Sequence, residues 1–380
     1  MRSRWRNGRA TRCCRGLRLW PLLLSPIAVA AACGGRTGLF VLDGSTPEEG
    51  GASDSSADVA DVTLPDVIEE SPAADGEAEA WQDAIDAPQE TATPDACTTG
   101  CGSLDIVGGT YLRSYDGFTY TDATNPATVS SFRLDQYEVT VGRFRPFVSA
   151  VVGGWLPAAG SGKHSHLNGG QGLAATGGGY ETGWDATDWN SQLAATADAW
   201  NANLVNGTWT PTAGGNEDLP ISELDWYEAY AFCIWDGGFL PSESEWNYAA
   251  AGGRDQRAYP WSPAFPPGST AIDCTQANYD GCPAGNVHPV GSKSPAGDGK
   301  WGQSDLAGNV WEWNLDWNAN SYVTPCVDCA DLTMDPMNPY RVIRGGSFGN
   351  GTGALLVSYR DLDPPYYRGD LVGVRCARGP

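Results

Sequence analysis

The chain has 380 residues, which is enough for one large domain or two small ones. It is strongly acidic, with 46 Asp and Glu residues against 23 Lys and Arg residues, and it contains 49 Gly and 16 Trp residues. The acidic balance argues against binding to nucleic acid, because phosphates attract Lys and Arg, and against docking on anionic lipid headgroups through a basic patch. The Gly and Trp content favours a fold of turns and irregular loops that aromatic side chains hold in place.

Residues 1–32 are predicted to be a signal peptide. Seven arginines lie between positions 2 and 18, and an apolar run from Leu19 to Ala32 follows, which is too short to span a bilayer comfortably. The run ends in Ala30-Ala31-Ala32-Cys33, which resembles the lipobox of bacterial lipoproteins, although Ala30 replaces the usual leucine. The resemblance implies that Cys33 is acylated and anchors the chain to a membrane. Gly34 after the cysteine favours the outer membrane, and an ordinary secretory signal is the alternative.

Residues 33–96 are predicted to be an acidic disordered linker. Positions 41–96 hold 16 acidic residues and no Lys or Arg. Such a composition buries too little apolar surface to offset the entropy lost on ordering. Aromatic residues, Gly and apolar alternation appear from Cys97 onward, so we expect one folded domain over residues 97–380.

The first predicted elements of this domain are a strand and the helix that follows it. Residues 132–139 alternate in a way that predicts a strand. Thr140 can then cap a helix whose apolar residues run from Val141 to Val148 at helical spacing. Residues 151–215 show little periodicity, and we expect long loops there.

Two further helices have clear starting residues. Asp225 can cap a helix over residues 226–235, and Ser242 with Glu245 forms the S-x-x-E pattern of a capping box. The helix after Ser242 is expected to end near Ala251, before a Gly pair. Residues 341–347 and 371–377 are predicted to be late strands.

The cysteine count supports export. Eleven cysteines are present, and eight remain once Cys13, Cys14 and Cys33 are set aside, an even number that is typical of disulfides in an oxidising compartment. Short separations suggest three local pairs: Cys97 with Cys101, Cys274 with Cys282, and Cys326 with Cys329. The last pair has CxxC spacing, so a redox or zinc role is the alternative to a plain loop disulfide there.

The chain has three histidines, His164, His166 and His288. His164 and His166 could offer two imidazoles to a metal, but their Gly-rich loop contains no nearby carboxylate or third ligand. We therefore expect them to be surface residues.

Several ordered segments resemble the formylglycine-generating enzyme, or sulfatase-modifying factor, family. They are Gly108 to Tyr111, Phe132 to Thr140, Leu219 to Trp246, the DLAGNVWEW run Asp305 to Trp313, the RVIRGGSF run Arg341 to Phe348, and Gly373 to Arg375. Together they cover essentially all of residues 103–380. The resemblance implies one α+β domain, related to the C-type lectin fold, with much irregular loop. It also implies a disulfide between Cys233 and Cys376, the two cysteines that the local pairing leaves over.

The resemblance implies a chemistry that this chain lacks. Active members of the family oxidise a cysteine or serine of a sulfatase to formylglycine, and the aerobic enzymes hold Cu(I) between two thiolates after the GGS motif. Those two positions fall on Asn350 and Leu355, and no cysteine occurs between 330 and 375. An amide or an isobutyl group cannot replace a thiolate, which is the soft ligand that Cu(I) prefers. We expect no copper and a catalytically degenerate domain.

Calcium is the ion that the resemblance implies instead. The family's structural calcium near GNVWEW takes a side chain at Asp305, backbone oxygens at Gly308 and Val310, and the carboxylate at Glu312, a hard donor set that suits Ca²⁺. The alternative is that these residues serve only packing and hydrogen bonding. A second, weaker site would begin at Asn278 and Tyr279, but its aspartate partner has no clear match.

Three functions remain open. The first is a surface module that binds a peptide or a glycan in the cleft that holds substrate in relatives, since aromatic faces stack on sugars and peptides. The second is an enzyme with altered chemistry in that cleft, and the third is a structural envelope lipoprotein without a ligand. We favour the first, although a fold does not fix a function. The polar groups around Ser347, Asn350 and Arg360 should discriminate among the three.

The lipid anchor can be tested directly. Replacing Cys33 with Ser removes the thiol that would be acylated, so the Cys33→Ser chain should move from the membrane fraction to the soluble fraction. Cys14→Ser is the matched control, because Cys14 lies inside the expected signal peptide and should not affect anchoring. Retention of Cys33→Ser in membranes would show that the anchor is wrongly assigned.

Overall fold

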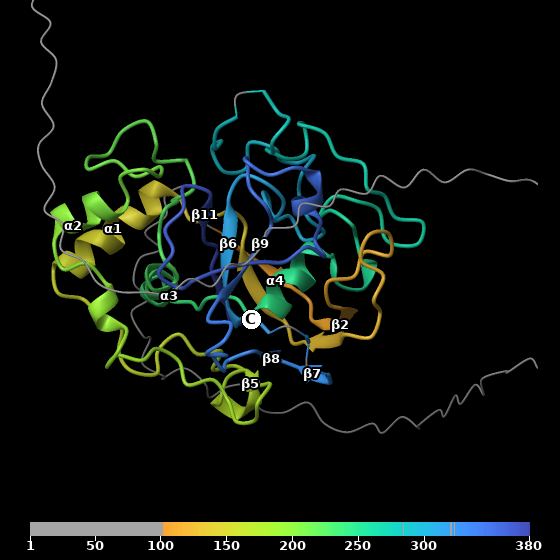
Figure 1. The fold of residues 1–380 in the computed structure, drawn as a ribbon, viewed down its shortest axis with the longest axis horizontal. Helices are drawn as coiled ribbons and strands as arrows, with labels where there is room; N and C mark the ends of the chain where they lie inside the picture. The colour runs from red at the N-terminus through yellow and green to blue at the C-terminus, as the bar shows by residue number, and fades with distance from the viewer. Residues whose placement is uncertain (1–101, 284, 320, 323) are drawn as a thin grey trace, which may run out of the picture. The chain divides into compact units, whose positions relative to one another are not determined.

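The computed structural model describes residues 102–380 except Ala284, Asn320 and Val323 (Figure 1). The expected signal peptide, linker, acylated Cys33 and Cys97–Cys101 pair lie outside the described residues. Within the described residues, no helix is long and apolar enough to cross a membrane.

A four-stranded sheet forms the centre of the domain. Its order is β10 (Asp361–Asp363), β9 (Arg341–Arg344), β6 (Trp311–Trp317) and β11 (Val372–Gly373). β9 runs antiparallel to β6 and β10, whereas β11 runs parallel to β6. All residues of β6 except Trp317 are buried, as expected of a strand that is covered on both faces.

Three smaller sheets surround this one. They are β1 (Ser103–Ile106) with β4 (Phe132–Asp135) and β12 (Ala377–Arg378), β2 (Gly109–Leu112) with β3 (Pro126–Val129) and β7 (Cys326–Val327), and β5 (Ala174–Ala175) with β8 (Cys329–Ala330). β4 lies between β1 and β12, so the beginning and the end of the domain share one sheet. The fold is α+β.

Four α-helices flank the central sheet in the described residues. They are α1 (Val141–Val152), α2 (Ala197–Asn203), α3 (Trp226–Trp235) and α4 (Glu243–Ala250). Figure 1 shows α1, α2 and α3 to one side of β6 and β9, and α4 to the other. Short 3₁₀ turns lie at Asn168–Gly170, Asn190–Gln192, Gly253–Asp255 and Thr352–Leu355.

The expected helix starts are confirmed by their caps. The Thr140 hydroxyl accepts a hydrogen bond from the Arg143 amide at 3.2 Å. Ser242 and Glu245 form the predicted capping box, and Asp225 forms another with Glu228, which the sequence analysis did not identify. Each box satisfies amides that a helix start leaves unpaired.

The expected strands are shorter in the structure. The strand predicted over 132–139 ends at Asp135, because the Val139 amide bonds to the Val374 carbonyl instead of to a neighbour in that sheet. The strand predicted over 341–347 ends at Arg344, because Gly345 and Gly346 adopt φ values of 99° and 73° and turn the chain. The strand predicted over 371–377 divides into β11 and β12, which belong to different sheets.

The region expected to be loops contains α2, which Thr196 caps, but is otherwise irregular and anchored by aromatic side chains. Trp184 and Trp200 are fully buried there. The Trp200 ring lies 5.8 Å from the rings of both Phe144 and Phe147 of α1, in edge-on packing. Many of the tryptophans therefore stabilise the core.

Three disulfides match the expected pairs. Cys233–Cys376 joins α3 to the residue before β12 across 143 positions, Cys274–Cys282 closes a short loop, and Cys326–Cys329 joins β7 to β8. An oxidised Cys326–Cys329 pair offers no thiolate to zinc.

The expectation that His164 lies on the surface is wrong. The ring is fully buried, with Nδ1 2.9 Å from a Glu181 carboxylate oxygen and Nε2 3.0 Å from a Glu245 carboxylate oxygen. Burial by itself would lower the pKa of His164, but the two carboxylates outweigh it and raise the pKa to about 10. The protonated ring thus ties the irregular segment before α2 to the start of α4. His166 is exposed, as expected.

This contact predicts a pH-dependent stability. The folded pKa of about 10 lies above the unfolded value near 6.5. Protonated His164 therefore stabilises the fold fully below about pH 6.5, and the contribution is lost as the pH rises toward 10. His164→Gln should lower the free energy of unfolding at pH 6 by about 3 kcal/mol, as measured by denaturant titration. In this variant the free energy of unfolding should also decrease less between pH 7 and pH 10 than it does in the wild type. His166→Gln is the control and should keep the wild-type slope, whereas identical slopes for all three chains would exclude the proposed role.

Candidate functional site

The segment after the GGSF motif folds into a tight turn. Gly346 packs so closely that an added Cβ would lie 2.7 Å from a Leu355 methyl carbon. Beyond it, the Ser347 hydroxyl donates to the Asn350 side-chain oxygen at 2.6 Å, and the Ser347 amide donates to the same oxygen at 3.1 Å. Asn350 and Leu355, the two positions at which the family resemblance places copper ligands, lie in this turn and in the 3₁₀ turn that follows.

Neither position offers a thiolate to a soft metal ion. The Asn350 oxygen is occupied by Ser347, and Leu355 is fully buried in a small apolar cluster with Tyr259 and Leu356. The six cysteines of the described residues are all in disulfides. In this part of the chain, no thiolate is available for Cu(I).

A buried charged cluster at the start of α4 lies next to Arg360. Arg360 binds the Glu243 carboxylate through two hydrogen bonds of 2.8 Å, Arg344 donates to the same carboxylate, and the Tyr322 hydroxyl donates at 2.8 Å. Burial opposes ionisation, but the two guanidinium groups lower the pKa of Glu243 to about 2. Glu243 therefore remains a carboxylate with its oxygens occupied.

One neighbour of this cluster has a pKa near neutrality. Burial, together with the charge of Glu243, raises the pKa of Asp316 to about 7. Its two oxygens accept the amides of Glu243 and Asp331 at 2.7 Å and 2.8 Å. The cavity that Asp316 and Arg360 line measures about 20 Å³, enough for a water molecule but not for a substrate.

The GNVWEW segment holds Glu312 in a saturated ion pair. Arg375 binds both Glu312 oxygens at 2.7–3.2 Å, and the Trp246 indole donates to one of them at 2.7 Å. Asp305, in contrast, accepts the Gly291 amide at 2.6 Å, and burial raises its pKa to about 6. The two expected calcium carboxylates thus have different surroundings.

A third carboxylate, Glu138, belongs to the same region. It accepts hydrogen bonds from the Asn309 side chain at 2.7 Å and from the Val310 amide at 3.1 Å. Burial and the charges of Asp305 and Glu312 raise its pKa well above the ordinary value. Three buried carboxyl groups share the single guanidinium of Arg375, so the raised pKa favours a proton on Glu138 unless a hard cation binds nearby and stabilises the carboxylate form.

The structure also brings the two expected calcium segments into contact. Gly308 adopts a φ of 90°, and an added Cβ would lie 2.3 Å from the Asn278 carbonyl. The Asn278 side chain donates to the Asn309 side chain at 3.2 Å. Tyr279 lies beside it, where its carbonyl accepts the amide of Cys282. Asn278 therefore packs against the GNVWEW turn.

Sequence reasoning gave no role to Glu138 or Glu243. Both occur in segments that carry the family resemblance, the Tyr-Glu-Val-Thr run and the Leu-Pro-Ser-Glu run. The signal available for Glu138 was a carboxylate next to the apolar residues Tyr137 and Val139, because such a group is buried only with partners. Glu243 lies among Ser242, Ser244 and Glu245 and gave no such signal.

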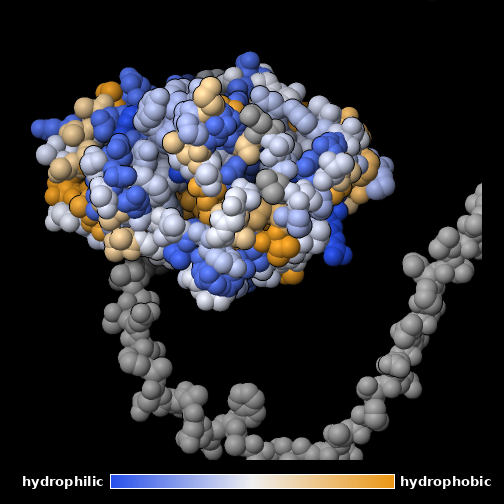
Figure 2. Space-filling model, turned by 60° about the horizontal axis from the view of Figure 1, so that its bottom comes forward, coloured by the Kyte–Doolittle hydropathy of each residue, from blue (hydrophilic) through white to orange (hydrophobic). Residues whose placement is uncertain are grey.

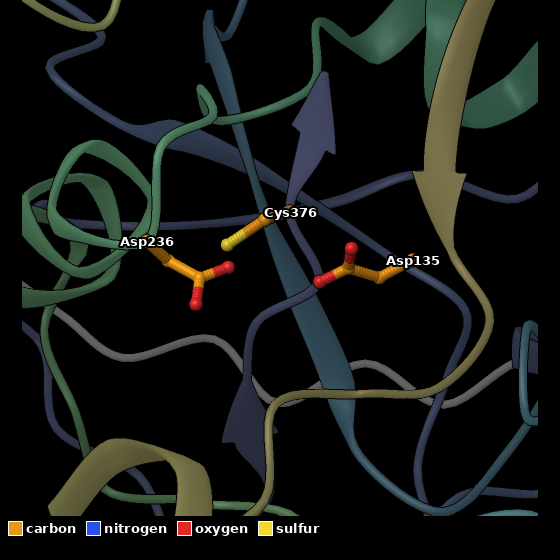
Figure 3. A group of neighbouring side chains, drawn as sticks. All are labelled: Asp135, Asp236 and Cys376. Carbon is orange, nitrogen blue, oxygen red and sulfur yellow. The ribbon is translucent and has the colours of Figure 1, made fainter. Parts of the chain in front are cut away.

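One group of three potential metal ligands exists among the described residues, and it is Asp135, Asp236 and Cys376 (Figure 3). The Cys376 sulfur belongs to the disulfide with Cys233. Arg143 and Arg378 each bind both carboxylates, with 2.7 Å between Arg143 and Asp135. The cluster is a closed ion-pair network next to a disulfide, and it has no ligand left for a metal.

Comparison with known proteins places these features in a family. Residues 88–380 match the sulfatase-modifying factor enzyme 1-like domain. The formylglycine-generating enzyme of Streptomyces coelicolor is 29% identical over 303 residues, which cover 73% of this chain and 88% of that protein. The inactive C-alpha-formylglycine-generating enzyme 2 of Bos taurus is 34% identical over 199 residues, which cover 47% of this chain and 59% of that protein.

Among solved structures, PvdO from Pseudomonas aeruginosa aligns with a TM-score of 0.49 and 19% identity, over 75% of this chain and 97% of that one. The domain match extends over well more than half of the sequence and includes every segment described above. The chain therefore belongs to the sulfatase-modifying factor enzyme 1-like, or formylglycine-generating enzyme-like, domain family.

Proposed function

We propose that this chain is an exported lipoprotein whose formylglycine-generating enzyme-like domain binds a peptide or a glycan at the cell envelope without converting it. The observation that carries the proposal is the loss of both copper-binding positions, since Asn350 and Leu355 stand there and neither supplies a thiolate. The similarity to a relative named as inactive supports the same reading. The Ala30 to Cys33 run supports export and anchoring.

The surroundings of Glu243 argue against proton transfer by this residue. Glu243 has a pKa near 2 and is paired with Arg344 and Arg360, so it neither releases nor takes up a proton near neutrality. A general acid or base needs a pKa closer to the working pH and access to substrate.

An enzyme with altered chemistry is the second candidate, and one observation favours it. Asp316 has a pKa of about 7, which suits proton transfer. However, its oxygens are occupied by two backbone amides, and its cavity holds a water molecule at most. We therefore keep the binding function as the proposal.

The absence of formylglycine chemistry can be tested by mass spectrometry. A sulfatase-type peptide with its cysteine should keep its mass after incubation with the folded domain, with or without added copper, because the two thiolates are missing. The Streptomyces coelicolor enzyme under the same conditions is the positive control. Conversion above a no-protein control would overturn the non-catalytic assignment.

We also propose a structural calcium ion at Asp305. The carbonyl oxygens of Gly308 and Val310 would complete the set, while Glu312 remains bound to Arg375. The raised pKa values of Glu138 and Asp305 support the proposal, because a hard divalent cation would stabilise the carboxylate forms that burial disfavours. Bound there, the ion would supply stability and hold the GNVWEW turn in place.

The calcium proposal predicts a metal-dependent stability. Addition of about 1 mM Ca²⁺ to the EDTA-treated protein should raise the midpoint of thermal unfolding by several degrees, because a ligand that binds only the folded state stabilises it. Asp305→Asn removes the charged ligand and should abolish this difference. Asp105→Asn, at an exposed acid, is the control and should retain it. A wild-type midpoint that is the same in Ca²⁺ and in EDTA would exclude the site.

A further inference from the structure

A second concave site has no lining residue in common with the turn at Asn350. It measures about 260 Å³, and its walls come from the irregular segment around residues 175–189, from α3, from β6 with Leu332 and Thr333, and from the start of β9. This volume falls below the range of about 300–1,000 Å³ for drug-sized ligands, so the pocket fits a single side chain better than a longer segment. The lining residues that bear on its ligand are Tyr180, Glu181, Trp189, Trp226, Tyr230 and Arg341.

Arg341 is a buried cation without a counterion. It is 3% exposed, and within the described residues no carboxylate forms an ion pair with it. Arg143, Arg344 and Arg375 are also buried, and each of them binds a carboxylate. Burial lowers the pKa of Arg341 to about 9, so the side chain still carries its charge at neutral pH. A buried charge without a partner is costly, and an anion beside it would relieve that cost.

One edge of the Arg341 guanidinium remains open to the pocket. Its two flat faces are covered by the indoles of Trp226 and Trp317, whose centres lie 3.6 Å and 3.5 Å from the guanidinium carbon. Nη1 donates to the Leu315 carbonyl, and Nε is closed to solvent, so neither can reach a ligand. Nη2 has no hydrogen bond within the described residues and is not among the closed atoms. This nitrogen can therefore donate a charge-assisted hydrogen bond to an anion in the pocket.

The carboxyl groups near the pocket do not supply that anion. One oxygen of Glu181 is closed to solvent, and the other is bound to protonated His164, which compensates its charge. Asp316 and Asp331 influence Arg341 through their charges without touching it, and the Asp316 oxygens accept two backbone amides. The charge that faces the pocket is thus positive, and the complementary ligand carries an anionic group.

The walls of the pocket indicate what should carry the anionic group. The Trp226 indole donates to the Asn314 carbonyl at 2.9 Å, and the Tyr230 hydroxyl donates to the Gly162 carbonyl at 3.1 Å. These polar atoms are used inside the protein, so the walls present mainly flat apolar faces. A sugar acid would leave several hydroxyl groups short of partners there, whereas an apolar or aromatic side chain loses nothing. An apolar side chain beside a carboxylate is the chemistry of a peptide's C-terminal residue.

The surface around the pocket also favours the end of a peptide over a large folded partner. Figure 2 brings forward the side of the domain that carries β5 and β8, where hydrophobic residues form separate patches among hydrophilic ones. A large protein interface would need a more continuous apolar surface. Tyr180 lines the pocket and is 45% exposed, so it can contact the residue that leads out of the pocket.

We infer that this pocket binds the C-terminal residue of a peptide, with the carboxylate on Nη2 of Arg341 and the apolar side chain against Trp189 and Tyr180. The inference rests on the proposed binding function and chooses a peptide over a glycan. Arginine suits this role because its charge persists in an apolar pocket, where the planar group stacks on indoles.

The test uses the purified full-length chain and three kinds of probe. The first is a glycine- and serine-based hexapeptide that ends in phenylalanine with a free carboxylate. The second is the same hexapeptide with a C-terminal amide, and the third is a pair of trisaccharides, one neutral and one with a uronate. Calorimetry should show that the free acid binds at least about tenfold more tightly than the amide, because only the acid offers an anion to Arg341.

Variants then locate the carboxylate. Arg341→Gln removes the charge and should reduce the affinity for the free acid to that for the amide. Tyr180→Ala removes a ring face, so it should weaken binding of both hexapeptides while the preference for the acid persists. Arg254→Gln is the matched control, because Arg254 is exposed and does not line the pocket, and it should keep the wild-type preference.

The outcomes separate the pocket from the wider binding function. A preference for the acid that Arg341→Gln abolishes and Arg254→Gln keeps supports the pocket. Equal affinities of the wild type for acid and amide overturn the pocket but keep peptide binding, and so does a preference that survives in Arg341→Gln.

Two further outcomes complete the test. If Arg341→Gln fails to fold, unchanged binding of both hexapeptides by Tyr180→Ala overturns the pocket. Binding of a trisaccharide without binding of either hexapeptide overturns the peptide assignment and keeps the wider function. A chain that binds none of the probes overturns both.

Discussion

The geometry of the domain depends on Arg375, whose guanidinium is wholly buried and uses all of its donors. Nε and Nη2 bind the Glu312 carboxylate, Nη1 donates to the carbonyls of Asp135 and Gln136, and Nη2 also donates to the carbonyl of Ser304. One side chain therefore joins the central strand β6, the end of β4 and the turn before GNVWEW. Loss of one partner of such a pair leaves a buried charge and costs about 3–5 kcal/mol.

The same saturation shows that the scaffold is held together independently of the turn at Asn350. Glu312, Glu243 and the pair Asp135 and Asp236 are each bound to guanidinium groups, so the charged residues of the core hold the fold together. None of these ion pairs involves Asn350 or Leu355. Asn350 and Leu355 instead make a local hydrogen bond and fill a small apolar cluster. The network of buried ion pairs therefore does not depend on which side chains occupy these two positions.

Features that depend on neighbours in sequence could be predicted, and features that depend on distant partners could not. Asp225 and Ser242 cap helices by contacting residues three positions away, so their capping roles can be predicted from the local sequence. His164 was expected to be exposed because its partners, Glu181 and Glu245, lie 17 and 81 positions away. Glu138 contacts the Asn309 side chain across 171 positions, which no local pattern indicates. The ordered motifs identified the family from the sequence. The pocket lined by Tyr180 and Arg341 could be recognised only from the folded structure.

The irregular segment before α2 is held in a way that affects a neighbouring pocket. His164 and Trp184 hold this segment from inside, and the same segment carries Tyr180 and Glu181 to a pocket of about 260 Å³. The opposite wall, including Arg341, comes from the central sheet and cannot change without disturbing the core. Substitutions in the segment can therefore alter the shape and polarity of the pocket while the sheet network stays constant. A pocket divided in this way, half on rigid strands and half on a loop held from inside, can vary in one half while the other half stays constant.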